Sequence, residues 1–447
     1  MQLDLTRGNI SDHIRTLAVP AGVGYFFHTL FNITDTYFAG TVSTEALAAL
    51  SLSFPIFFII ISVADGMGEA VTALVGNALG RGDVQGARCT AQNALLLAIG
   101  LAAVLSAAGY AAAPALMRSL GAEGTYLDEA LDYINTIIYG TGLFVFTFFL
   151  NALLNAVGDT VSLRNILIFA ALLNLALDWW FVRGGFGIAP MGVSGIALAT
   201  VLIEGISALY LFYRFRTKPL YAGLGAFRFD RALLRELFLQ GIPPSANFGL
   251  MAVGTYIITF FAAPYGREVV AAYGIGMRIE QIILLPAIGL NVAVLAIVAQ
   301  NSGGRFFQRI EETVRRSLFY GGIVALSGGA VLLAGGEHVM GFFSRDADVI
   351  AQGALYLRVE AFIIFPFIVI FTYLAMLQGI KKPAFIFYVS LARQVVAPLL
   401  LLTLLAHCGF GVLSVWLGVA GIVVSSALLT RWYAVRVLRA MRARLRM

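Results

Sequence analysis

Two aspartates lie inside stretches of the chain that are otherwise apolar. Asp35 falls within about residues 14–38 and Asp178 within about 163–183, each about five residues before the end of its stretch. An ionisable side chain at the centre of a bilayer costs about 2.5–3.5 kcal/mol even on a lenient scale. Two nearby carboxylates in a low dielectric do not both ionise cheaply, so such a pair can exchange a proton or hold a monovalent cation such as Na⁺. The pair is a predicted ion-coupling site, although an aspartate one turn below a helix end can also simply be hydrated.

Further polar side chains lie near these aspartates on the expected helices. Asn174 precedes Asp178 by four residues, which places both on one helical face, and His28 lies two turns deeper than Asp35. The other candidates are Asn151, Asn155, Thr200, Glu204, Asp65 and Glu69. For Asp65 and Glu69, ion coupling and packing around a polar inner vestibule both fit the spacing. His28 alone is more typical of a hydrogen-bonded interior histidine than of a proton relay.

These residues require helices that cross a membrane. The chain has 447 residues, of which 60% are hydrophobic and 12% charged, and a soluble domain carries about twice that charge. Every span must be helical, because lipid leaves no partner for a free backbone polar group and nothing alternates as a barrel strand does. The prediction is an all-α integral membrane protein with twelve transmembrane helices, at about 14–38, 47–76, 89–117, 130–157, 163–183, 191–214, 236–263, 269–299, 313–342, 350–378, 384–407 and 411–437.

Lysine and arginine predict the orientation of these spans. They gather at the two termini and in the even-numbered loops, whereas the odd-numbered loops hold only Arg118, Arg183, Arg267 and Arg345. Cytoplasmic loops carry the excess of positive charge, so both termini are predicted to be cytoplasmic, in a prokaryotic inner membrane. The pI near 9.3 therefore reflects membrane topology, and no nucleic-acid partner is expected.

The chain repeats itself with a constant offset of 223 positions. Residues 17–80 align with 240–303, so that Pro20 falls on Pro243 and Gly66 on Gly289. Six spans per copy is an even number, which predicts parallel repeats related by an axis along the membrane normal. The predicted domains are an N-terminal lobe at 1–214, a cytoplasmic connector at 215–235 and a C-terminal lobe at 236–447.

The repeat is not symmetric in charge. Asp35, Asp65, Glu69 and Asp178 fall on Ile258, Ile288, Val292 and Leu401. The second copy instead carries Arg278 with Glu280, Arg358 with Glu360, and Arg393. The balanced signs favour an internally paired structural network, because deleting one member of a buried pair is costly.

Motifs for other chemistry are weak. No GxxxxGK[ST] segment is present, which argues against ATP hydrolysis. Gly192–Gly195 matches the GxSG of intramembrane serine proteases, but no nearby span supplies a histidine, so helix packing is favoured. Cys89 and Cys408 are expected on opposite sides of the membrane, which predicts neither a disulfide nor a metal site. The chain is therefore not expected to be an enzyme or to need a cofactor.

Several segments together resemble the multidrug and toxic compound extrusion (MATE) transporters over nearly the whole chain. They are the segments 32–36 (NITDT), 76–83 (GNALGRGD), 155–160 (NAVGDT), 174–178 (NLALD), 195–200 (GIALAT), 278–281 (RIEQ) and 377–379 (LQG). Within the family the chain looks like the DNA-damage-inducible-F-like branch.

This resemblance implies two six-helix bundles in a V shape, alternating access, and export of organic cations in exchange for H⁺ or Na⁺. It also implies that Asp35, Asn174 and Asp178, joined by Asn151 and Thr200, form the ion pocket. His28 departs from the neutral polar residue usual at its position, and it could tune the pKa of that pocket or replace a substrate contact. Acidic coupling residues in spans seven and ten are not matched.

We therefore predict a secondary-active multidrug exporter that exchanges lipophilic organic cations for H⁺ or Na⁺ and works in the bilayer as a monomer. The alternative is a flippase for a lipid-linked precursor, which would need basic residues facing its cavity. Only Arg278, Arg358 and Arg393 could serve there.

Overall fold

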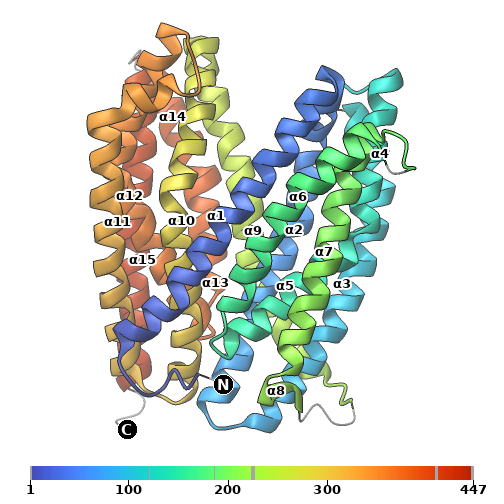
Figure 1. Cartoon of the computed structure of the whole chain (residues 1–447). Helices are drawn as coiled ribbons and strands as arrows, with labels where there is room; N and C mark the ends of the chain where they lie inside the picture. Colours follow the sequence, from blue (N-terminus) through green and yellow to red (C-terminus); the bar gives the residue numbers. More distant parts are fainter. Residues whose placement is uncertain (1–2, 120, 186, 223–226, 408–410, 444–447) are drawn as a thin grey trace. The chain divides into compact units, whose positions relative to one another are not determined.

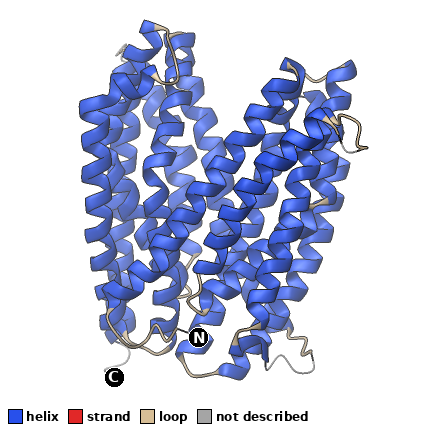
Figure 2. Cartoon of the chain, viewed as in Figure 1, coloured by secondary structure: helices blue, strands red, loops and turns tan. Residues whose placement is uncertain are grey.

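The computed structural model describes residues 3–119, 121–185, 187–222, 227–407 and 411–443 (Figure 1). The described residues are helices joined by short loops (Figure 2). The first half of the chain contains α1 (Ile10–Val42), α2 (Thr44–Gly80), α3 (Val84–Ser119), α4 (Gly124–Tyr139), α5 (Thr141–Ala156), α6 (Val161–Arg183), α7 (Gly192–Arg216) and α8 (Pro219–Ala222). The second half contains α9 (Arg231–Ala262), η1 (Ala263–Tyr265), α10 (Arg267–Gly303), α11 (Phe307–Gly341), α12 (Ala347–Gly379), α13 (Ala384–Leu391), η2 (Ala392–Val396), α14 (Ala397–His407) and α15 (Val412–Ala443).

These helices confirm the predicted all-α membrane fold. Ten of the described helices are long and apolar enough to cross a bilayer, and the bent pair α4–α5 forms an eleventh span. The remaining predicted span is α1, which has 33 residues and whose apolar stretch is interrupted by His28, Asn32 and Asp35. The predicted connector at 215–235 lies partly outside the described residues. Cys408 and the arginines at positions 444 and 446 lie wholly outside them.

Two spans are less regular than the sequence predicts. The span expected at 130–157 bends by 44° between α4 and α5, at Gly140, where a Cβ would overlap the side chain of Val201. The span expected at 384–407 contains a π-helical turn, η2, which carries Arg393. π-Turns inside α-helices frequently occur at functional sites.

The chain forms two compact units whose boundaries fall inside helices. Unit 1 comprises Met1–Asp4 and Val23–Ser245, and unit 2 comprises Leu5–Gly22 and Ala246–Met447. The first part of α1 therefore packs in unit 2, and the first part of α9 packs in unit 1. The predicted lobes at 1–214 and 236–447 follow the sequence repeat and stay a prediction, because the compact units divide the chain at other points.

Two glycines at equivalent positions of the repeat permit this exchange of helix segments. A Cβ on Gly66 of α2 would overlap the backbone of Ser245 in α9. A Cβ on Gly289 of α10 would overlap the backbone of Ala18 and Gly22 in α1. Ser245 and Gly22 are themselves related by the offset of the repeat. Small residues let helix backbones approach closely in a membrane, so both crossings depend on the absence of a side chain.

We expect Gly66→Ala and Gly289→Ala each to destabilise the protein by about 1–3 kcal/mol, the usual cost of overpacking. The measurement is the thermal unfolding midpoint of the purified protein in detergent. Gly100→Ala is the matched control, because Gly100 is exposed within α3 and a Cβ there meets nothing within 4 Å. Equal midpoints for Gly66→Ala and Gly100→Ala would contradict the proposed close packing.

A buried ion pair connects the loop between α5 and α6 to the segment just after α7. Asp159 accepts hydrogen bonds from the backbone N–H (3.0 Å) and the hydroxyl (2.8 Å) of Ser162. The Lys218 Nζ lies 2.5 Å from Asp159 Oδ2, and Arg214 lies 3.6 Å from the same atom. Burial alone would raise the pKa of Asp159, but the bonds from Lys218 and Ser162 outweigh it and hold that pKa below its ordinary value.

Asp159→Asn is expected to lower stability at pH 7 by about 3 kcal/mol, because Lys218 would remain buried without its charge partner. A carboxylate with a depressed folded-state pKa stabilises the fold above its unfolded pKa of about 3.9. That contribution is lost as the pH falls through the folded pKa, so the stabilities of wild type and variant should begin to converge below about pH 4. Unfolding midpoints between pH 7 and pH 3 test this. Glu312→Gln, which removes a solvent-accessible pair with Arg316, should change stability by less than about 1 kcal/mol.

Candidate functional site

Asp35 and Asp178, which the sequence places 143 positions apart, meet in unit 1 around one asparagine. The Asn174 side-chain amide donates to Asp35 Oδ1 over 2.8 Å and to Asp178 Oδ2 over 3.2 Å. The Thr200 hydroxyl donates to Asp35 Oδ2 over 3.2 Å. Helices α1, α6 and α7 thus each supply part of one pocket. All four side chains are buried, with Asn174 and Asp178 fully enclosed.

The two carboxyl groups also interact electrostatically with each other. A hydrogen bond between two carboxyl groups requires a proton on one of them, because two carboxylates are acceptors only. Asp178 Oδ1 and Asn174 Oδ1 are buried without a hydrogen-bond partner among the described residues. The pocket can therefore hold one shared proton, and it presents unsatisfied oxygens that would also suit a small cation.

Tyr133 of α4 belongs to this pocket, and sequence reasoning missed it. Its ring is 8% exposed and its hydroxyl interacts electrostatically with both Asp35 and Asp178. The repeat contains a signal that could have found it, because Tyr133 falls on Tyr356 at the offset of 223. Tyr356 likewise interacts with two acidic side chains of unit 2, Glu280 and Glu360.

The other predicted members of the pocket are less closely connected. Asn151 is buried on α5, and its Oδ1 has no hydrogen-bond partner in the described part of the chain. One turn before it, Thr147 lies 3.5 Å from the backbone oxygen of Glu204 in α7. Glu204 follows Thr200 by one turn, and its Oε2 is also buried and unpartnered within the described residues. His28 stacks on Phe31 of its own helix, with 6.4 Å between ring centroids.

Asp65 and Glu69 form a second acidic pair in unit 1. Both are half-buried on α2, and both interact electrostatically with Tyr25 of α1. Tyr25 lies ten residues before Asp35 on α1, about 15 Å along the helix. This pair is therefore separate from the Asp35 pocket.

In unit 2, the predicted pairing of charges is wrong for two arginines. Arg278 is exposed, and Arg358 pairs at the surface with Glu337 over 3.2 Å instead of with Glu360. Two residues apart on a helix, Arg358 and Glu360 point in different directions, because helical neighbours are three or four residues apart.

The enclosed charges of unit 2 are Glu280, Glu360 and Arg393, of which Glu280 is half-buried and the other two are buried. The Tyr356 hydroxyl donates to Glu280 Oε2 over 3.2 Å, and Glu280 interacts electrostatically with Arg393 and with Glu360. Arg393 also lies over the Phe367 ring, 5.7 Å from its centroid. One nitrogen of Arg393 and one oxygen of Glu360 lack partners among the described residues. The cluster is thus compact but incompletely satisfied.

A family model of known proteins matches the chain twice. The family model described as MatE matches residues 20–180 and again residues 243–403. Both ends of the second match lie at the same offset from the first (243 − 20 and 403 − 180), and this offset is the one found within the sequence.

The curated relatives include a transporter and multidrug resistance proteins. The chain is 29% identical to the FAD transporter of Shewanella oneidensis over 85% of its own length and 84% of that protein. It is 25% identical to the probable multidrug resistance protein NorM of Thermotoga maritima, over 92% of this chain and 89% of that protein.

Solved structures share the fold. The crystal structure of a MATE protein in the bent conformation superimposes with a TM-score of 0.93 at 23% identity, covering 99% of this chain and 98% of that one. A MOP superfamily transporter from Pyrococcus furiosus gives 0.92 at 24% identity, covering 99% and 98%. The chain belongs to the MATE family, and it is a multi-pass membrane transporter rather than an enzyme.

Proposed function

We propose that this protein is a secondary-active exporter in which the Asp35–Asp178 pair exchanges an ion while the transporter alternates between outward and inward access. The supporting observation is the buried contact between the two carboxyl groups through Asn174. Ion occupancy changes the charge of this pocket, so it changes the relative free energies of the two conformations.

The contact between the carboxyl groups favours H⁺ over Na⁺ as the coupling ion. A shared proton satisfies the pair without added ligands. Sodium would need several oxygen ligands, and the pocket offers Asp35, Asp178, Asn174 Oδ1 and Thr200 for that purpose. Separate proton and sodium gradients therefore distinguish the two ions.

An acidic pocket also favours cationic substrates, which would compete with the ion for the same charge. The relatives named as multidrug resistance proteins support small, lipophilic organic compounds. The alternative of a flippase for a lipid-linked precursor requires basic residues that are available to a phosphate along the transport path. Arg358 pairs with Glu337 and Arg393 interacts with Glu280, which disfavours this alternative. We further propose a monomer in a prokaryotic inner membrane with both termini cytoplasmic.

Asp35→Asn is expected to abolish ion-driven uptake of a cationic dye into proteoliposomes, because the pocket would lose its exchangeable charge. Transport is measured with a pH gradient and a sodium gradient imposed separately. We expect the wild type to respond to the pH gradient. Asp12→Asn is the matched control, since Asp12 is an exposed aspartate at the start of the same helix.

Intact transport by Asp35→Asn would refute the mechanism. A wild-type response to the sodium gradient alone would identify Na⁺ as the coupling ion and would contradict our preference for H⁺. Asp178→Asn should impair transport as well, because it removes the second half of the pair.

We propose that the Glu280–Glu360–Arg393 cluster of unit 2 is structural. Arg393→Met should destabilise the protein by about 3–5 kcal/mol, because it leaves enclosed acidic groups without their cation. Adding Glu280→Gln and Glu360→Gln to Arg393→Met should restore most of the unfolding midpoint. Proton-driven transport by the restored triple variant would support a structural role, and its loss would assign ion coupling to unit 2 as well.

A further inference from the structure

A groove between α11, α12 and α15 of unit 2 is not used by the proposed transport mechanism. It encloses about 530 Å³. Its apolar end is lined by Phe365 and Pro366 of α12, Leu318 of α11, and Val424 and Leu428 of α15. This lining is suited to a hydrocarbon chain.

The opposite end of the groove carries positive charge. Arg315 of α11 and Arg431 of α15 line it, and Arg431 interacts with the Tyr373 hydroxyl of α12. Glu311 lines it too, but its carboxylate pairs with Arg442 over 3.5 Å. Within the described residues, neither Arg315 nor Arg431 forms an ion pair with a carboxylate. Both are exposed, so this end attracts an anion.

From its apolar end to its charged end, the groove runs along the helices. Along α12 the lining runs from Phe365 to Met376, about 16 Å at 1.5 Å per residue. That length is about half of a hydrocarbon core of ~30 Å, so the groove matches one leaflet. The charged end faces the C-terminal end of α15, the side for which the sequence predicts a cytoplasmic location.

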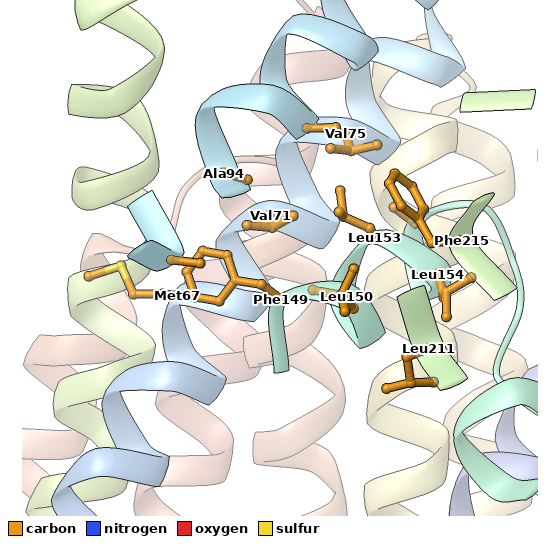
Figure 3. Packing of buried hydrophobic residues seen from close by; sticks show 14 of the residues in the cluster. Met67, Val71, Val75, Ala94, Phe149, Leu150, Leu153, Leu154, Leu211 and Phe215 are labelled. Carbon is orange, nitrogen blue, oxygen red and sulfur yellow. The ribbon is translucent and has the colours of Figure 1, made fainter. Parts of the chain in front are cut away.

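In the other repeat, the protein's own side chains occupy the corresponding space. Val369, Tyr373, Val435 and Leu438 fall on Phe146, Leu150, Phe212 and Phe215 at the offset of 223. Leu150 and Phe215 are buried in the core of unit 1 (Figure 3).

A segment of the chain also covers that region of unit 1. Helix α8 packs on α3 and α7, the counterparts of α11 and α15. Its Tyr221 contacts Phe212 and Phe215, with ring centroids 6.0 and 5.6 Å apart, and Leu220 is only 1% exposed. In unit 2, Val369 and Val435 stand where unit 1 has Phe146 and Phe212, and the groove is open there.

We propose that this groove binds one anionic phospholipid of the inner leaflet. An acyl chain lies along the apolar end, and the headgroup phosphate accepts hydrogen bonds from Arg315 and Arg431. Basic pockets between transmembrane helices on the cytoplasmic side bind anionic headgroups in this way. The lipid would take the place that α8 and the phenylalanines occupy in unit 1.

The test counts lipids that stay bound. The full chain is reconstituted into vesicles of equal phosphatidylglycerol and phosphatidylcholine, re-extracted in mild detergent and examined by native mass spectrometry. Wild type should retain one phosphatidylglycerol in preference to phosphatidylcholine. Arg315→Gln/Arg431→Gln should reduce that preference by about tenfold or more, because both headgroup contacts are lost.

Two further variants separate the loss of headgroup recognition from the filling of the groove and from a general loss of positive charge. Val369→Phe installs the residue of the other repeat and should reduce retention of both lipids by filling the groove. Arg316→Gln/Arg439→Gln removes the same charge from the same two helices at exposed positions and should retain the lipid. Unfolding midpoints confirm that each variant is folded. Equal retention by the two double variants, or no preference for phosphatidylglycerol in wild type, would overturn the proposal.

Discussion

The close crossings at Gly66 and Gly289 are the constraint on which the arrangement of the chain depends. Each lets one helix segment pass against a helix of the opposite sequence repeat without an intervening side chain. As a result, α1 and α9 each belong to both compact units. A symmetric duplication explains why both crossings occur at the same repeat position, and why the residues they contact, Ser245 and Gly22, also correspond. The chain therefore passes from one unit to the other within these two helices.

Because α1 belongs to both units, this helix connects the ion pocket of unit 1 to unit 2. Asp35 lies in the part of α1 that belongs to unit 1, whereas Ala18 to Gly22 of the same helix pack in unit 2. Under the proposed mechanism, protonation changes what Asn174 and Asp178 can hold and thus the position of α1. The equivalent helix α9 carries Ile258 where α1 carries Asp35. Under the proposed mechanism, an ion signal would therefore enter through α1 and not through α9.

Periodicity, hydropathy and repetition were enough to predict the local features of the fold. The helical spans, the offset of the repeat and the grouping of Asp35, Asn174 and Asp178 all depend on such local signals. Tyr133 and the break at Gly140 were missed, because they depend on contacts between helices. The pairing of Arg358 with Glu360 was wrong because proximity in sequence was taken for proximity on a helix. The unit boundaries inside α1 and α9 were missed because a repeat marks where copies begin and not where they pack.

The two repeats have kept their backbone crossings and changed what fills the space between helices. In unit 1, acids from α1 and α6 meet beside Tyr133, and phenylalanines with α8 occupy the groove beside α7. In unit 2, Tyr356 contacts acids from α10 and α12 near Arg393, and the matching groove is open and basic at one end. Glycine positions are fixed by the exchanged helices, because any side chain there would separate them. Positions away from the crossings have no such restriction, so one copy carries the buried pocket of Asp35 and Asp178 while the other carries an enclosed charge cluster and a groove.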